Sequence, residues 1–382
     1  MKRLILHIAG LLLMAACSTT SEQPAVTTIK VNADSFRTGG IDEFLDFSRC
    51  IVLQTPDSLP LGAVSTLQIT EDRILVGDSR TQSAFIFDAQ GRLLHVVSRQ
   101  GRAANEYTVL TDCEFTADGT LLVYDGMTGK TLEYDPDDGR CLATRTLGPG
   151  VSFIGLSGEL IAVNDANNWE EDHCAYRLYE MGELIRTAVP FDEAMCGLRT
   201  TREYGNSLFS MYDGRICMST TSDDTIYEID PDTGGVTPFL TVDFGSRYRP
   251  QPLSAAVTDK IMDGEYPSFP YAFSDLGEAF LFCYNYNRYI CVVLASRTGE
   301  VYYNGRLSPD KNGISLLPIS CRNSGRAGEL VSVVPAGRLS RALERRRKQA
   351  QDTAFVEELI ERAGDNIVLM FYTFDPHPQD RQ

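Results

Sequence analysis

Tryptophan and histidine are scarce in this chain of 382 residues, which contains one Trp and four His. The histidines beyond the N-terminal segment, His95, His173 and His377, are each isolated in the sequence, so a histidine-rich metal centre would need all three to converge in space. The ten cysteines are scattered without a C-x-x-C motif, which argues against a zinc or redox site. We therefore expect neither a metal nor a cofactor.

Basic residues are also in the minority. The chain has 35 Lys and Arg against 52 Asp and Glu, for a net charge of −17. A protein this acidic repels phosphate backbones, so we expect no nucleic-acid partner. The one dense basic run, residues 345–348, is followed by Glu357, Glu358 and Glu361, and we interpret it as a solvated helix face.

Long apolar runs are absent except at the N-terminus. There, Lys2 and Arg3 precede a stretch from Leu4 to Ala16 that is apolar apart from His7. About 13 residues are too few to span a hydrocarbon core of about 30 Å, so this stretch has the character of a removable signal.

The end of that stretch, Met14-Ala15-Ala16-Cys17, resembles the bacterial lipobox, in which small residues admit the peptidase and the thiol takes the lipid. We predict a signal peptide at residues 1–16, lipidation of Cys17, and a tether over residues 17–40. The alternative is an ordinary signal peptide cut elsewhere, with Cys17 incidental. Several acyl chains on one cysteine would anchor the protein stably without a transmembrane helix.

A repeated unit, a tight turn followed by a short apolar strand, occurs six times after the tether. Its irregular spacing of 40 to 64 residues suits propeller blades with loops of variable length, and the single tryptophan excludes Trp-Asp repeats. After each of the first five copies come two further strands. The six copies begin at Asp72, Asp118, Gly158, Asp213, Gly277 and Gly328.

The chain ends supply the remaining elements. Residues 338–363 are rich in helix formers, residues 367–372 form a strongly apolar strand, and one more strand lies near residues 50–53. We predict an all-β fold over residues 41–382. It is a six-bladed β-propeller whose N-terminal strand closes the last blade, with a C-terminal helix inserted in blade six. Such closure removes exposed sheet edges.

Cys283 and Cys291 flank residues 284–290, which must contain the turn of a hairpin. A turn centred on Asn287 would place the two cysteines opposite each other, within reach of a disulfide. A two-residue turn would shift the register and break this opposition. Between a disulfide and two buried free thiols, we favour the free thiols.

Four segments resemble the six-bladed β-propeller lipoproteins of Bacteroidetes, whose architecture is similar to NHL-repeat propellers. They are residues 51–55, 99–107, 222–229, and the helix together with residues 367–374. The second segment departs from the usual family form, since Ala103, Ala104 and Asn105 replace Gly, Pro and Gly. The resemblance implies the fold and a cell-envelope location, and it implies no established reaction.

Two segments are candidate binding sites. Arg99 and Arg102 are forked donors suited to carboxylates or sugar hydroxyls, and beside Glu106 the ring of Tyr107 can stack on a ligand. Alternatively, this segment is an inter-blade connector in which Glu106 pairs with an arginine. Trp169 lies in a polar loop that could stack on a glycan, or that is a simple surface loop.

The leading functional hypothesis is a cell-envelope lipoprotein that acts as a non-enzymatic binding or assembly module. Its partners would be the membrane, through Cys17, and an envelope protein or glycan on a propeller face. The outer membrane is the favoured location, on either its periplasmic or its outer surface. The alternative is a propeller lyase or hydrolase with an active site on the channel axis. No nucleophile–base motif supports assigning catalytic residues.

Overall fold

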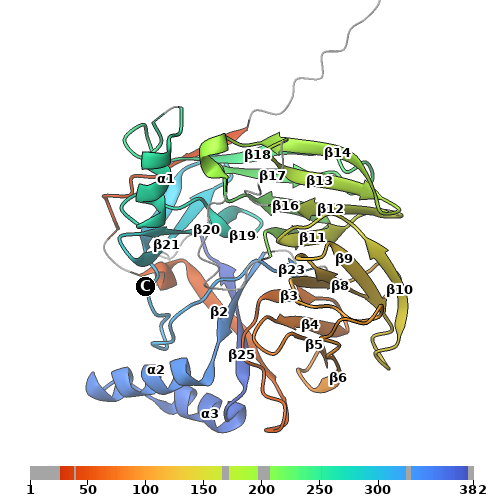
Figure 1. Cartoon of the computed structure of the whole chain (residues 1–382). Helices are drawn as coiled ribbons and strands as arrows, with labels where there is room; N and C mark the ends of the chain where they lie inside the picture. Colours follow the sequence, from red (N-terminus) through yellow and green to blue (C-terminus); the bar gives the residue numbers. More distant parts are fainter. Residues whose placement is uncertain are drawn as a thin grey trace, which may run out of the picture.

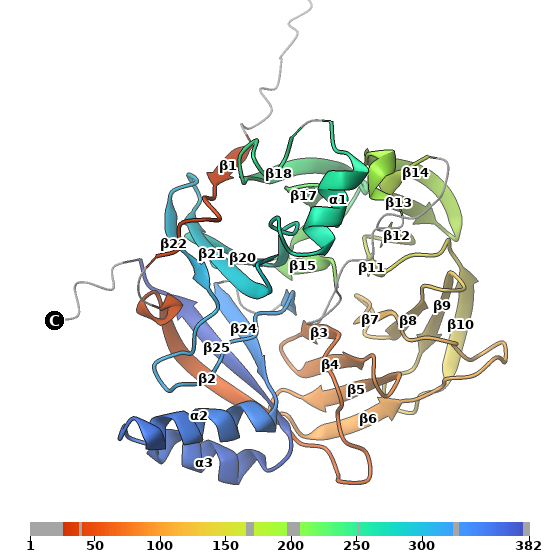
Figure 2. The ribbon, with the colours of Figure 1, turned by 60° about the vertical axis from the view of Figure 1, so that its left-hand side comes forward.

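The computed structural model describes residues 26–37, 40–165, 172–196, 207–250, 252–323 and 328–376. Short antiparallel sheets surround a central axis as six blades, so the predicted six-bladed β-propeller is confirmed (Figures 1 and 2). Blades 1 to 5 are four-stranded meanders, in which each strand is followed by its neighbour in the sheet. No helix in the described part of the chain is long and apolar enough to cross a membrane.

The strands of each blade are given from the axis outward. Blade 1 contains β3 (Thr66–Ile69), β4 (Arg73–Asp78), β5 (Ser83–Asp88) and β6 (Leu93–Val97). Blade 2 contains β7 (Asp112–Phe115), β8 (Leu121–Asp125), β9 (Lys130–Tyr134) and β10 (Cys141–Thr146). Blade 3 contains β11 (Ser152–Gly155), β12 (Leu160–Asn164), β13 (Cys174–Glu180) and β14 (Glu183–Pro190).

Blade 4 contains β15 (Phe209–Tyr212), β16 (Arg215–Ser219), β17 (Thr225–Ile229) and β18 (Val236–Asp243). Blade 5 contains β19 (Tyr271–Asp275), β20 (Ala279–Tyr286), β21 (Tyr289–Ser296) and β22 (Val301–Arg306). The chain passes between blades on one face, which we call the upper face. The opposite, lower face carries the turns between the first and second strands. The short helices η2 (Glu193–Met195) and α1 (Ala255–Met262) lie in the connectors that enter blades 4 and 5.

Blade 6 combines both ends of the chain. Strand β25 (Ile367–Phe374) pairs with β24 (Glu329–Val334) on one side and with β2 (Leu45–Leu53) on the other. A 3-10 turn, η1 (Ile41–Glu43), precedes β2. Residues near Pro318 run beside β24, with a bridge between Pro318 and Ser332.

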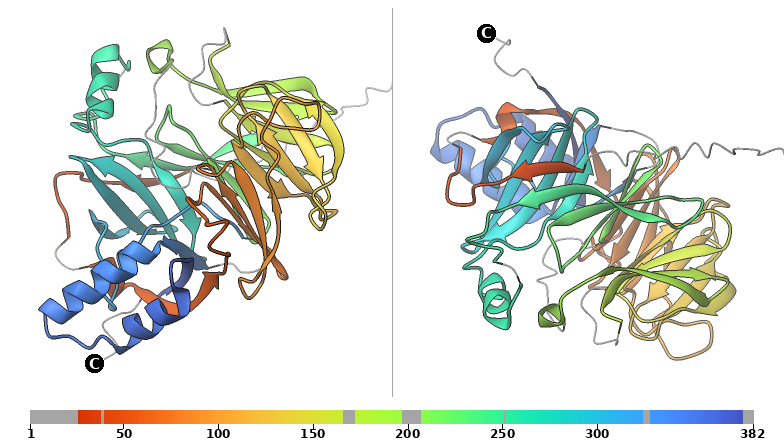
Figure 3. Two further views of the ribbon diagram at one scale, coloured as in Figure 1. Left: turned by 60° about the horizontal axis from the view of Figure 1, so that its bottom comes forward. Right: turned by 90° about the horizontal axis from the view of Figure 1, so that it is seen from above.

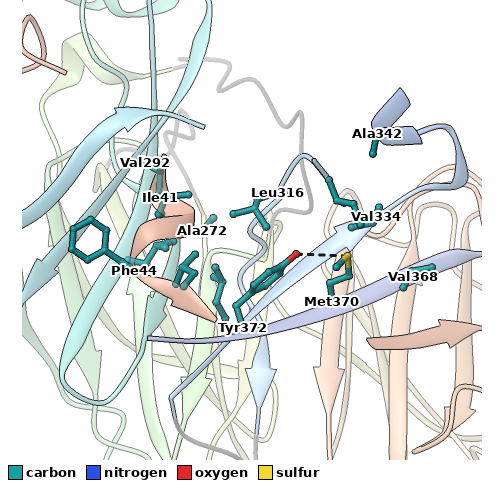
Figure 4. Packing of buried hydrophobic residues seen from close by; sticks show 14 of the residues in the cluster. Ile41, Phe44, Ala272, Val292, Leu316, Val334, Ala342, Val368, Met370 and Tyr372 are labelled. Atoms are coloured by element: carbon teal, nitrogen blue, oxygen red, sulfur yellow. Dashed lines mark hydrogen bonds between the residues drawn. The ribbon is translucent and has the colours of Figure 1, made fainter. Parts of the chain in front are cut away.

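Two helices, α2 (Ala336–Lys348) and α3 (Ala354–Ala363), connect β24 to β25, where the sequence predicted one helix. The break lies at Ala350, whose φ of 51° is incompatible with a continuous right-handed helix. The helices lie side by side against blade 6 (Figure 3). Ala342 of α2 and Val334 belong to the same apolar cluster as Leu316, Val292 and Tyr372, which fills the space between blades 5 and 6 (Figure 4).

The segment expected to be a tether is partly folded, which corrects that prediction. Strand β1 (Thr27–Lys30) pairs in parallel with β18 as an added outer strand of blade 4. Ile29, Val31 and Ala33 are 0%, 3% and 0% exposed. Their alternation with polar residues places all three on the face that packs on the propeller. The predicted signal peptide, Cys17 and the start of the tether lie outside the described residues.

The hairpin of blade 5 confirms the prediction of two buried free thiols. Asn287 and Arg288, both with positive φ, form a two-residue turn, so Cys283 pairs with Val292 rather than with Cys291. The two cysteines therefore point to opposite faces of the sheet, and both are buried and free.

Candidate functional site

A short strand closes the centre of the ring. Strand β23 (Arg322–Asn323) pairs in parallel with β3 of blade 1 and with β15 of blade 4. These are the innermost strands of blades on opposite sides of the ring, and β23 joins them into one ten-stranded sheet (Figure 1). The propeller axis is therefore filled by main chain at this level.

Arg322 completes the closure. Its side chain is 1% exposed, and one guanidinium nitrogen, Nη2, lies 2.7 Å from Asp112 Oδ2. Nη2 also donates to the Phe153 carbonyl at 2.5 Å and to Ser207 Oγ at 2.8 Å. The other, Nη1, donates to the Cys113 carbonyl at 2.9 Å. One side chain therefore ties blades 2 and 3 and the chain entering blade 4 to the axis strand.

The two carboxylates beside Arg322 are also engaged by the fold. Asp112 accepts hydrogen bonds from Thr66 Oγ1 and Ser152 Oγ, each at 2.7 Å, and so links blades 1 and 3. Glu114 accepts from the Gly155 N–H and lies 3.4 Å from Arg322 Nη1. Burial raises the pKa of Glu114 to about 7, although the Arg322 charge opposes this shift. Within this axial network, Glu114 therefore holds its proton more tightly than a free glutamate does.

A pocket of about 510 Å³, here called the upper pocket, opens above the closed axis. It extends from blade 6, which contributes Val333, Pro335, Arg338 and Ile367, to Val151 at the entry of blade 3. Between these limits the wall is formed by residues 62–65, 109–111 and 317–319, with Ser79 and Gln82. Its volume is within the range of about 300–1,000 Å³ typical of small-molecule sites.

The polar side chains of the upper pocket are mostly used by the fold. Ser65 Oγ donates to the Gly77 carbonyl at 2.8 Å, and Gln82 Oε1 accepts from the Leu110 N–H at 2.7 Å. Thr111 Oγ1 accepts from the Gly126 N–H at 2.9 Å. The pocket therefore presents a mainly apolar surface. Arg338, which is half-buried, is the only charged side chain among the described residues that line it.

A second pocket of about 680 Å³ opens on the lower face, among the first turns of blades 1 to 4. Several of its charged and polar groups already pair with protein groups. Arg145 forms an ion pair with Glu159 at the rim, and Thr120 Oγ1 donates to Glu133 at 2.9 Å. Glu114 pairs with Arg322 of the axis strand. A ligand there would compete with these contacts, so the upper pocket is the better candidate site.

The predicted segment with Arg99, Arg102, Glu106 and Tyr107 lines neither pocket. Arg99 and Arg102 are exposed, whereas Tyr107 is fully buried. The Tyr107 hydroxyl donates to the Gln82 carbonyl at 2.7 Å and accepts from the Arg99 N–H at 3.1 Å. The expectation that Tyr107 stacks on a ligand is therefore wrong, because its ring packs in the core between blades 1 and 2.

The same segment is bound to blade 2. Lys130 Nζ donates to the Glu106 carbonyl at 2.7 Å, and the Tyr134 hydroxyl donates to the Asn105 carbonyl at 3.0 Å. The Glu106 carboxylate accepts from the Ala103 N–H at 2.9 Å, within its own loop. The geometry is that of an inter-blade connector, although an arginine is not the partner shown for Glu106. Trp169, the other candidate, lies outside the described residues, as does Cys17.

Sequence reasoning missed both the upper pocket and Arg322. The pocket wall is assembled from connectors of several blades, the ends of β24 and β25 and the start of α2, which form no sequence motif. The sequence does contain a signal for the buried ion pairs at the axis. Asp112 and Glu114 flank Cys113 in a strand that must face the axis, and buried carboxylates require a cationic partner. Among the described residues, no group of three or more His, Cys, Asp or Glu is placed to hold a metal ion.

Comparisons with known proteins agree with this fold. A family model described as a domain of unknown function, DUF4934, matches residues 26–373. A Bacteroides fragilis protein described as exported shares 18% identity at a TM-score of 0.69, over 92% of this chain and 99% of its own. A DUF4221 family member from Bacteroides vulgatus shares 10% identity at a TM-score of 0.51, over 87% of this chain and 99% of that one. At these identities the likeness is one of fold. No protein of curated function matches the sequence.

Proposed function

This chain belongs to the DUF4934 family, and from that premise we propose that it is a ligand-binding module of the cell envelope, without enzymatic activity. The observation that carries the proposal is the upper pocket, a preformed and mainly apolar cavity above a closed axis. Apolar surface exposed in a concave site gains free energy when a ligand covers it, at about 25 cal/mol per Å². The pocket therefore suits a small ligand with an apolar body.

The envelope location rests on two supports. The N-terminal 17 residues have the features of a lipoprotein signal, and a structural neighbour of similar length is described as exported. With Cys17 lipidated, the propeller would be held at a membrane, where apolar ligands are concentrated. An envelope protein or a glycan bound on the exposed faces is a further partner compatible with this location.

An enzyme with an active site on the channel axis is less well supported. The axial groups with the chemistry for catalysis are Arg322, Asp112 and Glu114, and the first two are 1% exposed. Their hydrogen bonds are made to the innermost strands of neighbouring blades. A reaction there would need these contacts to break, at the cost of leaving buried charges unpaired.

The proposal can be tested with N-phenyl-1-naphthylamine, a neutral apolar dye that fluoresces when it is removed from water. We expect residues 18–382 to bind the dye, and Val109→Trp to abolish binding by filling the pocket. Leu94→Trp is the matched control, since Leu94 is 54% exposed on the outer strand of blade 1. Absence of binding, or equal binding by both variants, would contradict the upper pocket as the ligand site.

A further inference from the structure

The pocket of about 680 Å³ on the lower face, here called the lower pocket, holds more negative charge than its partners neutralise. Its ionisable lining consists of four acids and one base, which are Glu114, Asp118, Glu133, Glu159 and Arg145. Arg145 is paired with Glu159. Glu133 has no ion-pair partner among the residues that the structure describes, and its carboxylate accepts one hydrogen bond, from Thr120 Oγ1 at 2.9 Å.

Glu114 is the buried end of this charge. Its side chain is 5% exposed, and its Oε1 accepts a hydrogen bond from the Gly155 N–H. The other oxygen, Oε2, lies 3.4 Å from Arg322 Nη1 and accepts no hydrogen bond from any described residue. Arg322 also pairs with Asp112 at 2.7 Å, so one guanidinium serves two buried carboxylates. A second cation beside Glu114 would complete the compensation of this charge.

Glu114, Leu122 and Glu133 form one row across β7, β8 and β9, which lie side by side in blade 2 (Figure 2). Glu114 pairs with Leu122 in the antiparallel register, and Leu122 pairs with Glu133. Residues directly opposite each other project from the same face of a sheet, and all three line the lower pocket. Two steps between strands separate the glutamate Cα atoms by about 10 Å. The wall therefore presents two carboxylates with an aliphatic side chain between them.

The rest of the lower pocket offers apolar surface. Blade 3 contributes Ile154, Leu156 and Ile161, and blade 4 contributes Met211 and Ile216. An occupant that matches the whole cavity carries positive charge at two points and an aliphatic body between them. An inorganic cation would leave the apolar surface uncovered, and a ligand with one charge would leave one carboxylate without a cation.

We propose that the lower pocket binds an aliphatic diamine, a small ligand of the polyamine class. One ammonium group pairs with Glu114, the other pairs with Glu133, and the methylene chain between them covers Leu122. An apolar ligand would compete with the contacts already made in this pocket, whereas a diamine adds a cation to carboxylates that keep their present donors. This site is separate from the upper pocket, and the inference does not rest on the proposed function.

The experiment is isothermal titration calorimetry of residues 18–382 with 1,5-diaminopentane, pentylamine and 1,5-pentanediol at neutral pH. The three ligands share one carbon chain and carry two, one and no positive charges. We expect the diamine to bind at least roughly tenfold more tightly than pentylamine, because a hydrogen bond between charged groups contributes about this factor. The diol should give no detectable binding.

Variants assign the second charge to one residue. Glu133→Gln keeps the size of the side chain and should lower the affinity for the diamine to about that for pentylamine. Glu278→Gln is the matched control, because Glu278 is exposed on the first turn of blade 5 and does not line the lower pocket. It should leave the affinity unchanged, as should Val109→Trp, which fills the upper pocket.

Two results would overturn the proposal. The first is equal affinity of the unmodified protein for the diamine and for pentylamine, which would show that the second ammonium group finds no carboxylate. The second is an equal loss of affinity in Glu133→Gln and Glu278→Gln, which would show that the diamine responds only to the overall charge of the protein. Loss of diamine binding in Val109→Trp would place the ligand in the upper pocket instead.

Discussion

Arg322 and Asp112 form an ion pair, with 2.7 Å between Nη2 and Oδ2, in which both side chains are 1% exposed. The two residues are 210 positions apart in the sequence, and the pair connects the axis strand β23 with the innermost strand of blade 2. Removing one member of a buried pair leaves the other charge without compensation, which costs more than the pair itself contributes.

We therefore expect Arg322→Met to lower the free energy of unfolding by about 3–5 kcal/mol. Urea unfolding, monitored by far-ultraviolet circular dichroism, measures this change. Arg102→Met is the matched control, because Arg102 is exposed, and it should change stability by less than about 0.5 kcal/mol. The double variant Arg322→Met, Asp112→Asn should recover part of the loss. A stability for Arg322→Met close to that of the control would contradict the role of the ion pair.

The raised pKa of Glu114 makes the free energy of unfolding depend on pH. Burial raises its pKa from 4.5 to about 7, so the folded protein holds this proton more tightly than the unfolded chain does. The contribution of Glu114 is therefore most favourable below pH 4.5 and is lost as the pH rises to 7, with a slope of at most about 1.4 kcal/mol per pH unit.

Glu114→Gln should make the free energy of unfolding depend less steeply on pH between 4.5 and 7. Some dependence should remain, because burial raises the pKa of Asp224 to about 6 in the variant and in the unmodified protein alike. Unfolding by urea at intervals between pH 4.5 and 7.5 gives the two slopes. Identical slopes for the variant and the unmodified protein would show that Glu114 does not titrate in this range.

The N-terminal strand should stabilise the propeller. Ile29 is fully buried between blades 4 and 5, so Ile29→Ala should cost about 2–5 kcal/mol. Its neighbour Lys30 is exposed on the same strand, and Lys30→Ala should have little effect. Thermal unfolding of both variants distinguishes a packed strand from a loose tether. If Ile29→Ala melted at the temperature of Lys30→Ala, β1 would not contribute to the core.

Tyr107 should act in stability rather than in binding. Tyr107→Phe removes the hydroxyl that bonds the Gln82 and Val97 carbonyls, which should lower the free energy of unfolding by about 1–3 kcal/mol. Arg102→Ala should leave stability unchanged. Dye binding in the upper pocket should be the same for both variants, and loss of dye binding by Arg102→Ala alone would restore the exposed loop as a ligand site.

Lipidation should depend on one thiol. We expect Cys17→Ala to be recovered as soluble protein or as precursor, since the acyl chains have no other attachment point in the predicted signal. Membrane fractionation and mass spectrometry of the N-terminal peptide measure this. Normal acylation and membrane retention of the variant would contradict the lipoprotein assignment.

The sequence predicted the architecture because each blade repeats a local pattern of turn and strand that can be recognised within about 50 residues. Local patterns also misled. Residues 27–33 alternate apolar and polar side chains, yet their proximity to the signal peptide favoured a tether. The composition of residues 338–363 predicts one continuous helix, because nothing in it marks the positive φ of Ala350.

The site was harder to predict than the fold. Tyr107 lies in a segment with arginines and looked like a binding residue, whereas its hydroxyl serves two main-chain carbonyls of blade 1. The upper pocket is formed by connectors of blades 1 to 3 together with strand ends and the first helix of blade 6, so no contiguous stretch encodes it. Arg322 pairs with residues about 200 positions earlier, and only the closed ring brings them together.

The axis strand also constrains the order in which the protein can fold. β23 pairs with residues near Gln68 and Met211, and β2 pairs with the last strand of the chain. Contacts of such high sequence separation form slowly, because a long loop must be closed before they give any stabilisation. A chain that emerges N-terminus first, from a ribosome or across a membrane, therefore has its first five blades in place before the centre can be filled. Until β23 and β25 arrive, the innermost strands of blades 1 and 4 have unpaired edges, and blades 5 and 1 expose the apolar faces that later pack on blade 6. At this stage we expect a truncated chain to be prone to aggregation.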